Sequence, residues 1–102
     1  MYLVEIFLPV NNNQGQAQPG ELFVSVRQEL VARFGGMTAF TRTPAQGVWE
    51  ASERNKCQDD LIIYEVMAEQ VERSWWQTYK QLLEQRFAQD QLVIRFSEVQ
   101  LI

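Results

Sequence analysis

The sequence predicts an α+β fold in which four strands and two helices follow one another as β-α-β-β-α-β. Two observations predict it. Apolar and β-branched segments with alternating side chains recur near both ends and in the middle of the chain, as in strands. Between them lie two segments whose apolar residues recur every three or four positions, as in helices. With 102 residues, 46% of them hydrophobic, the chain is expected to form one domain, residues 1–102.

The first half of the chain is predicted to form a strand, a helix and a second strand. The first strand covers residues 2–9, and the polar loop NNNQGQAQPG follows it. A helix is expected over 21–34, ending at Gly35-Gly36 because glycine adopts the left-handed conformation at little cost. A second strand is expected over 37–43. The helix prediction depends on four apolar residues at helical spacing: Phe23, Val26, Leu30 and Phe34.

The second half is predicted to form a strand, a longer helix and a last strand. A turn at 44–47 and a short strand over 48–51 come first, followed by the polar stretch SERNKCQDD. The third main strand is expected over 61–68, the second helix over 69–89 and the last strand over 92–102. In the second helix Trp76 is expected at the flank, since adjacent residues differ in direction by about 100°. The buried side is expected to carry Val71, Trp75, Tyr79, Leu82, Leu83 and Phe87.

This element order is that of the ferredoxin-like fold, a four-stranded antiparallel sheet of order 4-1-3-2 with both helices on one face. The first and third strands are then central neighbours. If the more apolar side of each strand faces the helices, Glu5 and Glu65 lie together on the open face. Arg95 of the last strand is predicted to share that face with Glu5. Arg42 is a candidate neighbour of Glu65.

Apolar side chains are predicted to accompany these charges on the open face. Contiguous apolar patches mark interfaces or ligand sites, so we expect a homodimer that forms through this face, with its charges paired. Arg42 and Trp49 are candidates to line the mouth of a cavity there, although the segment TRTPAQGVWE that contains them is expected rather to form a hairpin that reaches over the partner subunit. The expected apolar residues are Leu3, Phe7, Leu61, Ile63, Met67 and Val93.

Composition excludes several classes of function. The net charge of −4 argues against a nucleic-acid partner, which needs clustered basic residues. No histidine is present, which removes Ser–His and Cys–His nucleophilic pairs and most zinc sites. Cys57 stands alone and forms no internal disulfide. We expect no metal and no cofactor, no membrane segment and no signal peptide in MYLVEIFLPV, and therefore a cytoplasmic protein.

The β-α-β-β-α-β order and the mixed open face resemble the dimeric α/β-barrel superfamily of small bacterial proteins. The resemblance extends over the whole chain, but it consists only of the order of strands and helices and includes no specific motif. It implies two sheets packed around a cavity and, from its cofactor-independent monooxygenases and isomerase-like members, cofactor-free chemistry. The histidine that several members use is absent here, so no catalytic residue is carried over.

Two functions follow from the same residues and stay open. In the first, a homodimer binds a small organic molecule in a sheet-face cavity, and a carboxylate of raised pKa acts as a general base while an arginine holds an oxygen of the ligand. In the second, Glu5, Glu65, Arg95 and Arg42 form an ion-pair lock in a non-catalytic structural or regulatory module. The sequence does not decide whether the protein is an enzyme.

Overall fold

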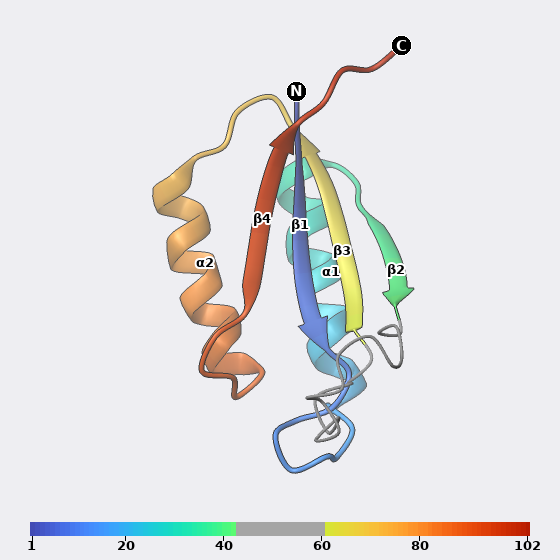
Figure 1. Ribbon diagram of the computed structural model, residues 1–102, viewed down its shortest axis with the longest axis vertical. Helices are drawn as coiled ribbons and strands as arrows, with labels where there is room; N and C mark the ends of the chain where they lie inside the picture. The colour runs from blue at the N-terminus through green and yellow to red at the C-terminus, as the bar shows by residue number, and fades with distance from the viewer. Residues whose placement is uncertain (43–60) are drawn as a thin grey trace, which may run out of the picture.

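The computed structural model describes residues 1–42 and 61–102. The predicted turn at 44–47, the strand over 48–51, Trp49 and Cys57 lie outside the described residues. Figure 1 shows the elements, which are β1 (Tyr2–Pro9), α1 (Gly20–Phe34), β2 (Thr38–Arg42), β3 (Leu61–Ala68), α2 (Arg73–Arg86) and β4 (Val93–Glu98).

The four strands form one antiparallel sheet in the order β2-β3-β1-β4. This is the predicted order 4-1-3-2 read from the other edge, so the fold class is confirmed. In Figure 1 the strands lie in front of α1, and neither α1 nor α2 lies on the sheet face toward the viewer. We call this uncovered side of the sheet the open face.

The core lies between the sheet and the helices, and alternation along the strands builds it. Val4, Ile6 and Leu8 of β1 are fully buried, and they pack with Val26 and Leu30 of α1. The predicted helix-facing side of β1 is therefore confirmed. Because successive side chains of a strand point to opposite faces, the same pattern directs the intervening residues of β1 to the open face.

The end of α1 also agrees with the sequence. Gly35 has a positive φ of 85°, and its N–H donates to the carbonyl of Val31 at 2.8 Å. This left-handed cap lets the chain turn back toward the sheet, where β2 begins at Thr38.

The buried side of α2 differs from the prediction. Trp76 is buried, whereas Trp75 is only partly buried. Leu83 is fully buried, whereas Leu82 remains 43% exposed. The buried positions are spaced three, four and four residues apart and continue past the end of the helix; they are Trp76, Tyr79, Leu83 and Phe87.

The aromatic packing between the helices gives the physical reason. The Trp76 ring stacks on Phe34 of α1, with ring centroids 5.4 Å apart. Trp75 instead stacks on Tyr79 at 4.8 Å, and the Arg33 guanidinium lies 4.1 Å from its ring centroid. The two tryptophans therefore have different roles: Trp76 packs in the core, and Trp75 forms a cation–π contact with Arg33 at the surface.

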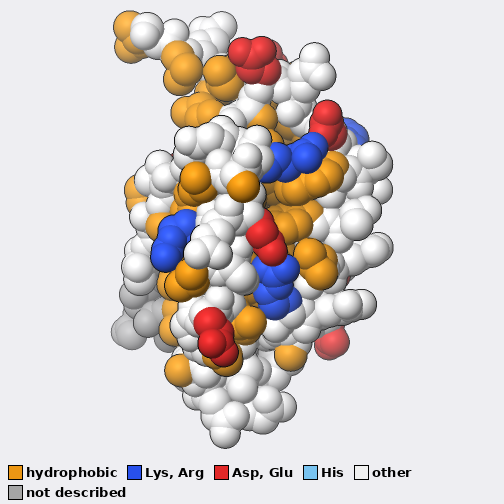
Figure 2. All heavy atoms as spheres, turned by 180° about the vertical axis from the view of Figure 1, so that it is seen from behind, with side chains coloured by type: hydrophobic (Ala, Val, Ile, Leu, Met, Phe, Trp, Pro, Cys, Tyr) orange, Lys and Arg blue, Asp and Glu red, His pale blue; other side chains and the backbone are white. Residues whose placement is uncertain are grey.

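Two ion pairs join the helices across this aromatic layer. The Arg86 guanidinium donates to both carboxylate oxygens of Glu29, at 3.0 and 2.9 Å, and the Tyr79 hydroxyl donates to the same carboxylate at 2.8 Å. Arg33 pairs with Glu72 at the start of α2. Figure 2 shows this helix-covered side of the molecule, where acidic and basic side chains lie among apolar ones.

The pairing changes the ionisation of these groups. The hydrogen bonds from Arg86 lower the pKa of Glu29 despite its partial burial. Burial, together with the hydrogen bond to Glu29, raises the pKa of Tyr79. The arrangement therefore keeps a charged carboxylate bound to a neutral phenol and a cation at neutral pH.

Adjacent leucines on α2 provide a matched test of this helix orientation. We expect Leu83→Ala to lower the free energy of unfolding by about 2–5 kcal/mol, because it leaves a cavity in a fully buried position. Leu82→Ala is the control, and it is expected to change stability by about 0.5 kcal/mol or less. Urea denaturation followed by circular dichroism measures both. Equal losses for the two variants would contradict the assigned orientation of α2.

Candidate functional site on the open sheet face

A row of polar residues crosses the middle of the open face. Glu5 of β1 lies directly opposite Glu65 of β3 on one side and directly opposite Arg95 of β4 on the other. Thr38 of β2 lies opposite Glu65 and completes the row. Directly opposite residues of an antiparallel pair share a face and interact, so the row places two carboxylates side by side with a guanidinium at one end. We call these four residues the polar row.

Arg95 and Glu5 form an ion pair within the chain. The Arg95 Nε donates to the Glu5 carboxylate at 2.8 Å. The Arg95 guanidinium also lies 4.8 Å from the ring centroid of Phe7, the next open-face residue of β1. The Glu5 side chain is 18% exposed and that of Arg95 59% exposed, so part of the guanidinium remains accessible to a ligand.

Glu65 has a different environment. In residues 1–42 and 61–102 no cation forms an ion pair with it. Burial raises its pKa, and the charge of Glu5 and a hydrogen bond with that residue raise the pKa further. Its proton is therefore held more tightly than that of an ordinary glutamic acid, which is the direction that favours a group in acid–base chemistry.

Apolar residues flank the polar row on both sides. Toward the carboxyl end of β1, Phe7 lies opposite Ile63 and Val93, and Phe40 lies opposite Ile63. Three apolar residues of the open face are about half exposed: Phe40 at 47%, Met67 at 46% and Val93 at 55%. The row is thus a polar strip on an apolar surface that no helix of the described chain covers.

A hollow of about 320 Å³ adjoins Glu65. It exists because β2 begins only at Thr38, so that the last residues of β3 have no neighbour from β2. The turn after α1 forms its far wall, and Gly36 has open space where a side chain would stand. Glu65 lines it together with Leu3, Phe34, Gly35, Gly36, Met37, Thr38, Val66 and Met67.

The structure brings three of the five predicted site residues together, namely Glu5, Glu65 and Arg95. Arg42 lies opposite Leu61, four residues along β3 from Glu65, which is about 13 Å. It is therefore not the strand partner of Glu65. Trp49 lies outside the described residues, so its predicted place at a cavity mouth stays a prediction.

Thr38 and Phe40 are the open-face residues that the sequence analysis missed. Both alternate correctly along TAFTR, and this alternation is the signal that was available. Their position across the sheet depends on the register of β2 against β3. That register is not encoded by alternation, because a shift of two residues preserves every face.

No protein-family model matches the chain, and comparison with curated proteins and with solved structures finds no significant match. Within residues 1–42 and 61–102, no three His, Cys, Asp or Glu side chains converge as a metal-ligand group. The helices in this part of the chain are too short and too polar to cross a membrane. What the site can do must therefore be argued from its geometry.

The pKa of Glu65 can be measured directly. We expect ¹³C NMR titration of its side-chain carboxyl to give a pKa above the ordinary value, and Glu5→Gln to lower that pKa only in part, because burial is the larger cause. Glu98→Gln, which removes a carboxylate opposite Tyr2, is the control and should leave the titration unchanged. A Glu65 pKa that does not respond to Glu5→Gln would contradict the shared position of the two carboxyls.

The same shift gives stability a defined pH dependence. Because the pKa of Glu65 is higher in the folded chain than in the unfolded one, its contribution to the free energy of unfolding is complete below the unfolded pKa. The contribution is lost as the pH rises through the folded pKa. We expect Glu65→Gln to flatten the fall in stability over this range, and thermal unfolding at successive pH values measures it.

Proposed function

We propose that the chain forms a homodimer through its open face and binds a small organic molecule beside Glu65, on which it performs cofactor-free acid–base chemistry. This assigns it to the dimeric α/β-barrel kind of protein that its element order resembles. The observation that carries the proposal is the polar row. A carboxyl of raised pKa, a carboxylate and a guanidinium stand in register on an otherwise apolar face that neither α1 nor α2 covers.

The dimer is supported by the exposed apolar residues of the open face. Phe40, Met67 and Val93 are each about half exposed in the single chain and lie on the same side of the sheet as the polar row. A second open face packed against the first would remove these side chains from water. A standard interface buries about 800 Å² on each partner, which is of the order of one face of a small sheet.

The acid–base chemistry is supported by the division of roles in the row. Arg95 neutralises Glu5 and keeps accessible N–H donors that suit a carbonyl or enolate oxygen. Glu65 retains its proton to higher pH and lines the adjacent hollow. The apolar flanks would exclude water and strengthen both effects. The reaction class that fits is proton transfer at a carbon next to a carbonyl group, as in an isomerisation.

One observation favours the second function, an ion-pair lock in a non-catalytic module. The Arg95–Glu5 pair at 2.8 Å already satisfies one carboxylate and fixes two strands relative to each other. In that reading a cation supplied by the assembly would neutralise Glu65 as well. Removal of the Glu65 charge separates the two functions, because the dimer is expected to persist under the first function and to dissociate or melt early under the second.

The dimer is tested by placing a charge at its proposed interface. Sedimentation of the wild-type chain at micromolar concentration is expected to give a molecular mass of about twice the 12.0 kDa of one chain. Val93→Asp is expected to give the mass of a monomer, because burying an unpaired carboxylate in the interface would cost free energy. Val31→Asp is the matched control, since Val31 is 43% exposed on α1, away from the sheet face. A monomeric wild-type chain, or equal behaviour of the two variants, would contradict the dimer.

The chemistry is tested with 2-tetralone, a ketone with acidic α-protons. We expect the wild-type protein to speed the exchange of these protons for deuterium in D₂O, and Glu65→Gln to reduce the acceleration by about tenfold or more, as for the loss of a general acid–base group. Glu98→Gln is the control and should retain the acceleration. Exchange is followed by ¹H NMR.

Sedimentation of the same Glu65→Gln sample separates the two functions. A folded dimer that has lost the acceleration supports acid–base chemistry at Glu65. A variant that dissociates or melts early supports the ion-pair lock. If the wild-type protein gives no acceleration over buffer, acid–base catalysis on an enolisable ketone is wrong.

A further inference from the structure

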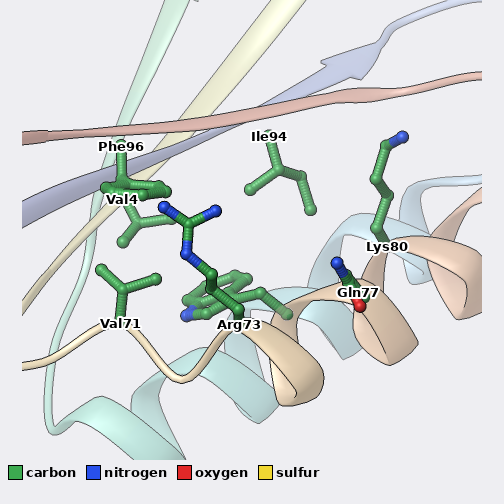
Figure 3. A pocket seen from close by; sticks show the side chains of 8 residues that line it. Val4, Val71, Arg73, Gln77, Lys80, Ile94 and Phe96 are labelled. Carbon is green, nitrogen blue, oxygen red and sulfur yellow. The ribbon is translucent and has the colours of Figure 1, made fainter.

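A second pocket lies on the opposite side of the sheet, between α2 and the edge strand β4. It has a volume of about 130 Å³. Figure 3 shows its lining, in which Ile94 and Phe96 come from β4 and Arg73, Gln77 and Lys80 come from α2. Val4, Val71 and Trp76 complete the lining.

The pocket exists because α2 covers the helix-facing side of β4 only in part. Ile94 and Phe96 lie opposite Ile6 and Val4 and therefore share their face of the sheet. Ile6 and Val4 are fully buried, yet Phe96 is still 40% exposed. The large apolar side chains of α2 pack toward the core and α1 instead, and the ion pairs described above hold the helix there.

Beside the Trp76 ring, α2 contributes a row of polar side chains to the pocket. Arg73, Gln77 and Lys80 are spaced i, i+4 and i+7 and form one stripe along the helix. Opposite this stripe stand the apolar side chains of β1 and β4. The pocket thus has an apolar floor and a cationic rim, which is the arrangement that an anion with an apolar body needs.

The two cations of the rim are not equivalent. Lys80 pairs with Glu84 at 3.4 Å. In the described part of the chain Arg73 has no carboxylate partner, and its guanidinium lies 5.1 Å from the ring centroid of Phe96, above the pocket floor. In Figure 3 the Arg73 side chain reaches toward Val4 and Phe96.

The place of Arg73 in the helix also favours an anion. It is the first residue of α2 and follows the N-cap residue Glu72, whose carboxylate is paired with Arg33; the first turn of the helix carries no acidic residue. The helix dipole makes this end positive, so a cation here is unfavourable by itself, and an anion bound beside it is favoured by both the dipole and the guanidinium.

We propose that this pocket binds a small aromatic carboxylate, with the ring over Val4, Ile94 and Phe96 and the carboxylate on the Arg73 guanidinium. An apolar cavity of about 150 Å³ takes one benzene ring, so the pocket is of the right size for a single ring. The planar guanidinium matches a carboxylate through two parallel hydrogen bonds. This site does not depend on the dimer or on the chemistry at Glu65.

The test is a titration of the ¹⁵N-labelled wild-type chain with benzoate, followed by ¹H–¹⁵N NMR. We expect the amide signals of Gln77, Ile94 and Phe96 to shift and to saturate. Arg73→Gln is expected to weaken binding by about tenfold or more, as for the loss of a charged hydrogen-bonding partner. Arg27→Gln, at an exposed position of α1 outside the lining of the pocket, is the matched control, and binding should stay within about twofold of wild type.

A second ligand makes the test independent of any variant. Benzamide has the shape of benzoate without its charge, and we expect it to leave the wild-type pocket signals unshifted at the same concentration. Equal shifts with benzamide, equal losses in the two variants, shifts confined to the open face, or no shift at millimolar benzoate would each overturn the proposal. Because the benzamide comparison uses the wild-type chain, a failure of Arg73→Gln to fold does not remove the test.

Discussion

The position of β1 between β3 and β4 is the constraint on which the rest of the molecule depends. Its alternate residues fill the core, and this fixes Glu5 on the other side of the sheet. Its two registers then decide the neighbours of that carboxylate. One neighbour is a second carboxylate and the other is a guanidinium. A slip of either register by two residues would keep the fold and abolish the polar row.

The helix layer depends on a different kind of interaction. Its contacts combine large aromatic rings with ion pairs between α1 and α2, so the helices are tied to each other as well as to the sheet. Surface ion pairs contribute little free energy singly, but here they are attached to an aromatic cluster that fixes their geometry. The edge strand β4 receives less cover as a result, and the fold acquires a pocket at that edge.

The periodicity of the sequence predicted the element order, and the element order predicted the sheet topology. The faces of β1 and β3 were predictable because side-chain alternation is a property of one strand at a time. The sequence predicted that Glu5, Glu65 and Arg95 share a face for the same reason. The placement of Arg42 was wrong as a neighbour of Glu65, because the register between two strands is set by contacts across the sheet and by the segment that joins them. Thr38 occupies the position instead.

The helices show the same limit. Helical spacing located both helices, but two adjacent tryptophans and two adjacent leucines allow two orientations of α2 that differ by one residue, and only the packing against Phe34 selects between them. The pairing of charges between the helices is likewise not visible in either helix alone. Glu29 accepts from both terminal nitrogens of Arg86 on α2, and Arg33 pairs with Glu72 at the N-cap of α2.

The polar row has a consequence for electroneutrality in the proposed assembly. Each chain brings two carboxylates and one guanidinium to the row, so two facing rows would enclose an excess of negative charge if every carboxyl were ionised. Enclosing this negative charge would raise the free energy of the dimer. Because the pKa of Glu65 is already raised, a proton bound at each Glu65 would remove part of the charge. Association and protonation would then be thermodynamically linked: formation of the dimer would take up protons, and the association constant would depend on pH.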